Sequence, residues 1–274
     1  MATAARRVFF GCGAGATAGF WWSMPARAAK AVRCDDSVAP GSEHKKTWGV
    51  PWVNDWDNPS ERGLPTQSRN IKRQLILIRH GQYEREKSAK SDKEQTLTDL
   101  GRLQAEETGR YLAAALPTSP LFRATSVKSV HVSDLTRAQQ TCETLLEAMG
   151  SRAPSAPALV DPLLREIFPC DPQPAYPKKA KPESERIAEA AFSKYFHRPT
   201  NDESSVEVVV CHANVIRYFL CRALQVPPEA WLRFSLPHCS ITTISIDGRG
   251  RVSVCGVGAA NHLPPDHQSV ANIS

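Results

Sequence analysis

The chain has 274 residues, of which 41% are hydrophobic and 23% are charged, a composition typical of a globular protein with one large domain or two small ones. Its net charge of +6 is concentrated in residues 1–33, which carry five basic side chains and no acidic one. Residues 34–274 therefore carry a net charge of only +1, and we expect no strongly basic surface that binds nucleic acid.

The amino-terminal segment, residues 1–33, has the features of a membrane anchor or a targeting sequence. Residues 8–26 are uncharged, and their glycines at positions 11, 15 and 19 would give a helix one smooth face. The aromatic side chains at 20–22 suit the boundary between membrane and water. We expect residues 8–26 to contact a membrane; a cleaved secretory signal, a mitochondrial address and a flexible tail are the alternatives.

Residues 34–70 are polar and rich in proline, glycine and serine, so they are interpreted as a linker. Within this linker, residues 48–57 hold Trp48, Trp52 and Trp56 at a spacing of four. Three indole rings in a segment without its own core need a surface to cover them. They either fold back on the following domain as a strap or dock on another subunit, and their spacing alone does not separate the two readings.

Residues 71–274 alternate between short aliphatic runs and longer amphipathic runs, which predicts a single catalytic α/β domain. The expected strands are 74–79, 126–133, 206–212, 240–246 and 251–257, and the expected helices are 98–116, 136–149 and 214–224. Because the strands are apolar without interruption, both of their faces should be covered. The pattern therefore predicts a mostly parallel sheet with helices on both faces.

Polar side chains follow several of these strands at the point where each strand ends. The first strand ends in Arg79 and is followed by His80, the strand 206–212 ends in Cys211 and His212, and Arg137 lies shortly after Ser133. In parallel sheets the ligand site lies beyond the carboxyl ends of the strands. We therefore expect two histidines and two arginines to converge on one crevice.

Such a crevice suits a phosphate group. The guanidinium fork of arginine matches the tetrahedral oxygens of phosphate, and helices that begin next to the crevice add backbone N–H groups. A histidine among these donors can attack phosphorus and form a phosphohistidine that water later hydrolyses. A carboxylic acid must then protonate the leaving alcohol, and Glu166 in the loop after the second helix is the candidate.

Four sequence blocks in chain order resemble the histidine phosphatase superfamily, whose members share the phosphoglycerate-mutase-like fold. The blocks are RHG at 79–81, SDLTRAQQT at 133–141, LLRE at 163–166 and CHANVIR at 211–217. The resemblance implies that fold for residues 71–274. It also implies that the chain is a hydrolase.

The resemblance further implies a role for each matching residue. His80 would be the nucleophile that accepts the phosphoryl group, and Arg79 and Arg137 would bind the phosphoryl oxygens. His212 would be the second histidine of the phosphate-binding pocket, and Glu166 the proton donor. No metal ion and no other cofactor are implied.

Within the superfamily, the chain is similar to membrane-tethered serine/threonine-protein phosphatases of mitochondria. This similarity implies phosphorylated proteins as substrates, with phosphohistidine as a further substrate, and an amino-terminal anchor in the outer or the inner mitochondrial membrane. It also implies a homo-oligomer that forms through Trp52, Trp56 and Asp57. Mutases carry serine, tryptophan and asparagine where this chain has Tyr83, Arg85 and Glu86, which favours a phosphatase over a sugar-phosphate mutase.

Two other functions remain open at the level of the sequence. The chain could act as a phosphatase or mutase of small metabolites, or as a multimeric scaffold with a secondary catalytic role. The remaining histidines show no comparable convergence and are interpreted as surface or packing residues: His131, His197, His238, His262 and His267.

Overall fold

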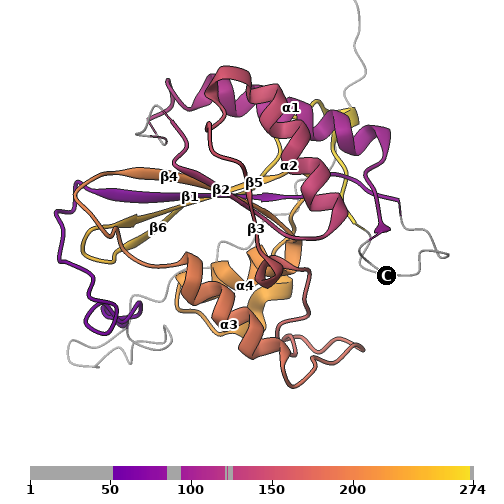
Figure 1. The fold of residues 1–274 in the computed structure, drawn as a ribbon. Helices are drawn as coiled ribbons and strands as arrows, with labels where there is room; N and C mark the ends of the chain where they lie inside the picture. The colour runs from indigo at the N-terminus through magenta and orange to yellow at the C-terminus, as the bar shows by residue number, and fades with distance from the viewer. Residues whose placement is uncertain (1–51, 85–93, 121, 123–125, 272–274) are drawn as a thin grey trace, which may run out of the picture. The chain divides into compact units, whose positions relative to one another are not determined.

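A computed structural model describes residues 52–84, 94–120, 122 and 126–271. Its centre is a six-stranded sheet in the order β3-β2-β4-β1-β5-β6 (Figure 1). The strands are β1 (Lys72–Arg79), β2 (Ser129–Val132), β3 (Leu159–Val160), β4 (Ser205–Cys211), β5 (Ile241–Asp247) and β6 (Val252–Ala259). The α-helices are α1 (Asp99–Ala115), α2 (Thr136–Met149), α3 (Ser184–Tyr195) and α4 (Ala213–Ala223), and short 3-10 helices are η2 (Gly150–Arg152), η3 (Pro162–Leu164), η4 (Pro228–Arg233) and η5 (Pro265–His267).

The predicted α/β fold is confirmed, with a mixed rather than fully parallel sheet. Strands β3, β2, β4 and β1 run parallel, whereas β5 is antiparallel to both of its neighbours, β1 and β6. A tight turn after Asp247 joins β5 to β6, and such a short connection forces two adjacent strands to be antiparallel. Because β5 is also antiparallel to β1, it begins beside the carboxyl end of β1, where Ile241 pairs with Ile78.

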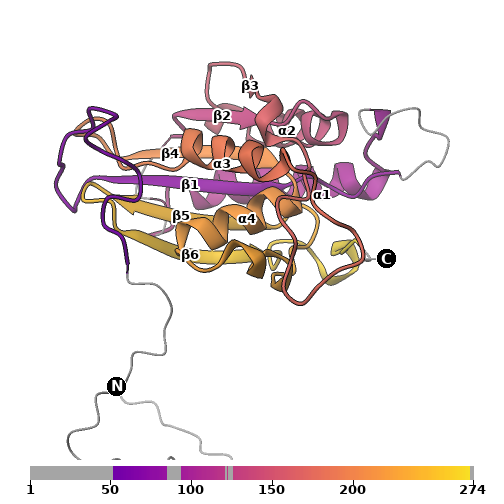
Figure 2. The ribbon, with the colours of Figure 1, turned by 90° about the horizontal axis from the view of Figure 1, so that it is seen from below.

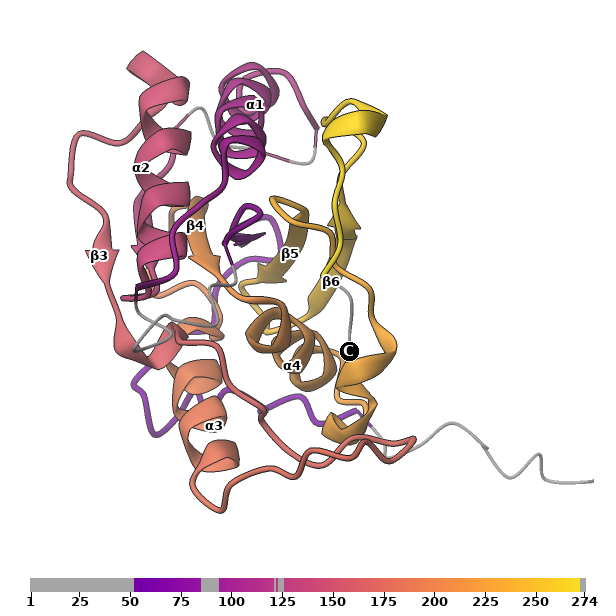
Figure 3. The ribbon, with the colours of Figure 1, turned by 90° about the vertical axis from the view of Figure 1, so that its right-hand side faces the viewer.

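Helices cover both faces of the sheet, which explains the continuous apolar sequence of β1. Ile76 and Ile78 pack in the cluster formed with α1 and α2, whereas Leu75 and Leu77 pack in the cluster formed with α3 and α4. Figures 1 and 3 show these two helix pairs on opposite sides of the strands. Successive side chains of a strand point to opposite faces, so a strand buried on both faces must be apolar at every position.

Helix α3 was missing from the sequence-based prediction. Its apolar stripe consists largely of alanines, with only Phe192 and Tyr195 as large buried side chains near its end. Alanine contributes little to a hydrophobic periodicity, so the segment looked like a polar connection. The helix is nevertheless packed in the core, because Phe192 lies against Phe219 of α4, with ring centroids 6.1 Å apart.

The segment before β1 lies on the same domain. Figure 2 shows it at the end of the sheet where the turn between β5 and β6 also lies, and the Gln67 N–H donates to the Gly248 carbonyl over 3.0 Å. The Trp56 indole N–H donates to the Gly250 carbonyl over 2.7 Å, and the carboxylate of Asp57 is buried against Arg198. Trp52 is 42% exposed. Residues 52–57 therefore include both strap-like contacts and one uncovered ring.

Several sequence-based predictions fall outside the described residues. They concern the segment 1–33, the anchor at 8–26 and Trp48. Within the residues that the structure does describe, no helix is both long enough and apolar enough to cross a lipid bilayer.

Candidate active site

The carboxyl ends of neighbouring strands bring the predicted side chains together. Arg79 is the last residue of β1 and lies in register with Cys211 at the end of β4, so His80 and His212 leave the sheet side by side. Arg137 comes from the first turn of α2, just beyond β2. Figure 3 views the ribbon along the strands, with α1 and α2 above them and α3 and α4 below.

The side chain of His80 lies at the centre of this cluster. The centroid of its ring is 5.0 Å from that of His212 and 5.1 Å from that of Tyr83. The guanidinium carbon of Arg137 lies 4.7 Å from the centre of the Tyr83 ring. Among these residues, Arg79, His80, Arg137 and His212 are all buried, with no more than 5% of each exposed. The four predicted residues therefore share one buried site.

The hydrogen bonds of His80 determine which nitrogen can react. Its Nδ1 lies 2.8 Å from the carbonyl oxygen of Gly81, and because a carbonyl only accepts, Nδ1 must carry the proton. Burial lowers the pKa of His80 well below its ordinary value, and electrostatic interaction with His212 and with the guanidinium groups of Arg79 and Arg137 lowers it further. A neutral ring with Nδ1 protonated leaves a lone pair on Nε2, which is what a nucleophile needs.

The side chain of His212 is held in place by a residue that follows the neighbouring strand β2. Its Nε2 lies 2.9 Å from the hydroxyl oxygen of Ser133, which follows β2. Burial lowers its pKa well below the ordinary value, and Arg137 and Arg79 add to the effect. Its buried Nδ1 has no hydrogen-bond partner among the residues described. A bound anion is one group that could satisfy this nitrogen.

Glu166 lies in the same cleft as Arg79 and His80. Burial raises the pKa of its carboxyl group, whereas the charges of the two arginines, Arg79 first, and the backbone N–H of Asn214 oppose the rise; the net shift is upward. The Asn214 N–H donates to Glu166 Oε1 over 3.2 Å at the start of α4. A carboxyl group with a raised pKa retains its proton closer to neutral pH, which suits a proton donor.

The prediction that His238 is a surface or packing residue was wrong. His238 is only 4% exposed, its Nε2 lies 3.0 Å from Nη2 of Arg79, and its ring centroid is 5.7 Å from that of His80. It belongs to the active-site cluster because it precedes β5, whose antiparallel direction places its start beside the carboxyl end of β1. The signal in the sequence was therefore a histidine just before a strand, not after one.

The glycine that follows His80 is required by the close approach of α1. A Cβ atom on Gly81 would lie 2.5 Å from the carbonyl oxygen of Gly101, and the Gly81 N–H donates to the Thr141 hydroxyl over 3.0 Å. A Cβ atom on Gly101 would lie 1.9 Å from the carbonyl oxygen of Gln82. The two glycines let the loop that carries His80 pack directly against the first turn of α1.

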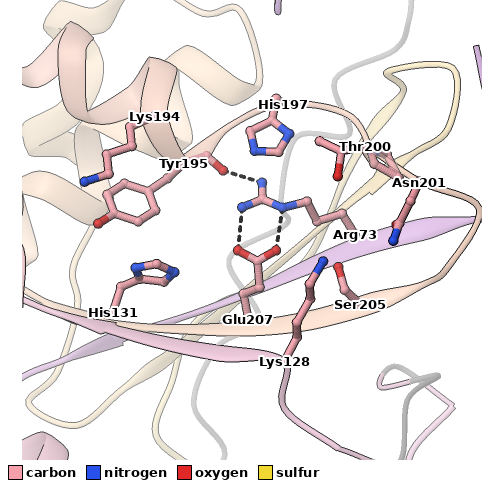
Figure 4. A pocket seen from close by; sticks show the side chains of 11 residues that line it. Arg73, Lys128, His131, Lys194, Tyr195, His197, Thr200, Asn201, Ser205 and Glu207 are labelled. Atoms are coloured by element: carbon pink, nitrogen blue, oxygen red, sulfur yellow. Dashed lines mark hydrogen bonds and ion pairs between the residues drawn. The ribbon is translucent and has the colours of Figure 1, made fainter. Parts of the chain in front are cut away.

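A second polar cavity lies at the opposite, amino-terminal edge of the strands and has a volume of about 200 Å³ (Figure 4). Its most prominent cation, Arg73, donates from Nε and Nη2 to the carboxylate of Glu207 over 2.7 and 2.6 Å. A third nitrogen of Arg73 donates to the Tyr195 carbonyl. Glu207 therefore balances the charge of Arg73, and Lys128 and Lys194 also line the cavity. Unlike the site around His80, this cavity contains none of the residues that the sequence motifs predict for catalysis.

A buried neutral histidine between two arginines, with a second histidine and a protonatable carboxyl group nearby, is the arrangement of a histidine phosphatase. The sequence model of the histidine phosphatase superfamily (branch 1) matches residues 75–173 and 184–256. The chain belongs to this superfamily.

Within this superfamily, the chain is similar to several proteins of known description. The chain is 38% identical over 253 residues to "Serine/threonine-protein phosphatase Pgam5, mitochondrial" of Caenorhabditis elegans, covering 84% of this chain and 82% of that protein. It is 42% identical over 202 residues to the Homo sapiens protein with the same description, covering 71% of this chain and 65% of that protein. Among solved structures, a phosphoglycerate mutase from Plasmodium falciparum is 33% identical with a TM-score of 0.50, covering 71% of this chain and 96% of that one.

Proposed function

We propose that the chain is a serine/threonine-protein phosphatase that works through a phosphohistidine intermediate. The observation that carries this proposal is the neutral ring of His80, whose Nε2 lone pair lies in a buried site with two arginines. The names of its relatives support phosphorylated proteins as the substrate class. Phosphohistidine in proteins is a further substrate that the same chemistry allows.

In the first step, Nε2 of His80 forms a bond to phosphorus while the bond from phosphorus to the serine or threonine oxygen breaks. Glu166 gives its proton to that oxygen, so the product leaves as a neutral alcohol. Arg79, Arg137 and His212 stabilise the charge on the phosphoryl oxygens during the transfer.

In the second step, water attacks the phosphorus of the phosphohistidine, and the Glu166 carboxylate accepts a proton from that water. The phosphorus–nitrogen bond breaks, inorganic phosphate leaves, and the His80 lone pair and the Glu166 proton are restored. All of these roles are filled by side chains, so we expect the reaction to need no metal ion and no other cofactor.

A small-metabolite phosphatase or mutase is the second candidate, favoured by the similarity to the Plasmodium falciparum enzyme. The deciding experiment measures phosphate release from phosphoserine peptides and from sugar phosphates side by side, without added metal, for the wild type and His80→Ala. We expect His80-dependent hydrolysis of the peptides. Equal turnover by both proteins would rule out His80 as the nucleophile, and turnover of sugar phosphates alone would favour the metabolite enzyme or a scaffold with weak activity.

We also propose that residues 8–26 anchor the protein in a mitochondrial membrane, since its relatives carry the word mitochondrial in their names. The full chain and a chain without residues 1–33 are compared by alkaline extraction of isolated mitochondria. The full chain should stay with the membrane pellet, and the shortened chain should be released. Release of both would contradict the anchor.

Self-association through Trp52, Trp56 and Asp57 remains a proposal as well. What supports it is the exposure of Trp52 and of Val53, whose exposed fractions are 42% and 53%. Trp56 and Asp57 are engaged within the chain, so Trp52→Ala is the cleaner test of a contact between subunits. Light scattering measures the mass of this variant and of the wild type. Equal masses would indicate that the segment only folds back on its own domain and makes no contact between subunits.

A further inference from the structure

The cleft that contains His80 extends well beyond the phosphate-binding residues. Its volume is about 450 Å³, within the range of sites that enclose whole ligands. Arg79 and His80 form only part of its lining. A second cavity of about 580 Å³ shares Arg233 and Phe234 with the outer end of this cleft. Two adjoining cavities suit an extended polypeptide better than a compact metabolite.

The outer wall of the cleft is aromatic. Phe168 lies between Tyr176 and Trp231, with ring centroids 6.2 and 5.0 Å away, and Phe234 lines the same space. Phe168 comes from the loop after η3, whereas Trp231 belongs to η4, so two separate segments build this wall. Aromatic walls of this kind offer apolar contact to the backbone and side chains of a bound peptide.

Three cations line this cleft, two beside the aromatic wall and one nearer to Glu166. Lys178 Nζ lies 5.3 Å from the centre of the Phe168 ring, and Arg233 donates from Nε to the Gln173 carbonyl over 3.0 Å, a contact that leaves its charge unbalanced. Arg217 is only 7% exposed, and its buried Nε has no hydrogen-bond partner among the described residues. Arg217 is also close enough to Glu166 to lower its pKa, so it lies toward the reacting end of the cleft.

Negative charge is scarce in this cleft. Among its lining residues in the described part of the chain, Glu166 is the only carboxylate, and the proposed reaction uses it as a proton donor. The adjoining cavity adds one carboxylate, Glu229. The cations that line the outer cleft therefore outnumber the acids, and an anionic ligand fits this excess.

We infer that the outer cleft binds acidic side chains next to the phosphorylated residue of the substrate polypeptide, with Arg217, Arg233 and Lys178 as the residues that determine this specificity. This inference rests on the proposed protein phosphatase function. Arg217 meets the acidic side chain nearest to the phosphate, and the exposed pair Arg233 and Lys178 meets those farther along. The preference for acidic sequences is then a property of this surface rather than of the catalytic residues.

The test uses three phosphoserine peptides that differ only in their flanking residues, which are aspartates, asparagines or lysines. We expect kcat/KM of the wild type to be on the order of tenfold higher for the aspartate than for the asparagine peptide, since each exposed ion pair contributes a few-fold. The lysine peptide should be the poorest substrate. The ratio should shrink as salt is raised, because exposed charges are screened.

Reversing the charge of two cleft residues then tests whether they determine the preference for acidic peptides. The double variant Lys178→Glu, Arg233→Glu should favour the lysine peptide over the aspartate peptide. Lys179→Glu is the matched control, because Lys179 pairs with Asp171 at 3.0 Å and does not line the cleft. Comparing ratios within each protein removes any general loss of activity.

Each outcome of this experiment is decisive. Equal kcat/KM of the wild type for the aspartate and asparagine peptides would overturn the inference, and so would a reversal of preference by Lys179→Glu as large as that of the double variant. Hydrolysis of sugar phosphates with no hydrolysis of any peptide would instead overturn the proposed function, and the inference with it.

Discussion

Nη2 of Arg79 lies 3.0 Å from Nε2 of His238. This contact fixes which atoms donate and which accept in the hydrogen bonds that continue from His238 to Ser269. A guanidinium group only donates, so His238 Nε2 must accept and its Nδ1 must carry the proton. That proton is donated to the Ser269 hydroxyl oxygen, 2.8 Å away, which also accepts from the side-chain amide of Gln104. The segment near the carboxyl terminus therefore helps to hold a phosphate-binding arginine.

Replacing His238 by leucine should impair catalysis through Arg79. A hydrogen bond to a charged group is worth about 1.5–3 kcal/mol, so we expect kcat/KM for phosphopeptides to fall on the order of tenfold to a hundredfold. His238→Gln should lose much less, because the glutamine Oε1 can take the place of Nε2 as the acceptor. Steady-state kinetics of the two variants check the prediction, with thermal unfolding as the control for folding. Full activity of His238→Leu would contradict it.

Most of the site could be predicted from the sequence because it obeys one rule. Arg79 ends β1, His80 and His212 directly follow β1 and β4, and Arg137 lies in the first turn of α2, just beyond β2. Strand direction therefore places the four residues at one edge of the sheet. His238 could not be found in this way, because its position depends on the antiparallel direction of β5. Pairing between distant strands is a property of the folded chain and leaves no local pattern.

The segment before the first strand shows a second limit of the sequence. Its tryptophans were recognised as needing a covering surface, but their spacing did not say which surface. The partners Gly250 and Arg198 lie about 140 residues or more along the chain, so the contacts of Trp56 and Asp57 are visible only in the structure. Helix α3 was missed for a different reason, since a stripe of alanines has little hydrophobic contrast.

The pH dependence of kcat/KM should have an acid limb that His80 produces and an alkaline limb that Glu166 produces. Activity requires His80 to be neutral, and because its pKa is lowered, the loss on the acid side should come well below pH 6.5. Activity also requires Glu166 to be protonated, and because its pKa is raised, the loss on the alkaline side should come above the ordinary value of 4.5. Initial rates on a phosphopeptide between pH 4 and 9 measure both limbs.

Glu166→Gln is the variant that assigns the alkaline limb. Glutamine cannot deliver a proton, so kcat should fall on the order of a hundredfold or more, as is typical for loss of a general acid. The alkaline limb should disappear, while the acid limb that His80 produces should stay. An unchanged alkaline limb in this variant would assign the titration to another group.

Gly101→Ala should destabilise the fold at the site. The added Cβ would lie 1.9 Å from the Gln82 carbonyl oxygen, so α1 must move away from the loop that carries His80. Overpacking of this kind costs about 1–3 kcal/mol, which urea unfolding followed by circular dichroism measures. Gly256→Ala in β6 is the control, because a Cβ there meets no atom within 4 Å. Equal unfolding midpoints for the two variants would show that the contact is easily relieved.

The buried ion pair of Asp57 and Arg198 should contribute strongly to stability. Their side chains are 0% and 6% exposed, and Asp57 accepts from Arg198 Nη2 over 2.7 Å and from the Arg198 backbone N–H over 2.8 Å. Asp57→Asn leaves a buried guanidinium without its counter-charge, which costs about 3–5 kcal/mol. Asp55→Asn, at an exposed position two residues earlier, should change the free energy of unfolding very little.

The pKa of Asp57 gives this prediction a second readout. Burial raises the pKa, but the hydrogen bonds and charge of Arg198 outweigh it, so the folded-state pKa is lower than the unfolded value of roughly 3.9. The stabilisation is therefore fully present above the unfolded pKa and is lost as the pH falls through the folded one. The difference in unfolding free energy between the wild type and Asp57→Asn should shrink as the pH is lowered from 7 toward 3. A difference that stays constant over this range would mean that the variant acts through packing and not through the charge of the carboxylate.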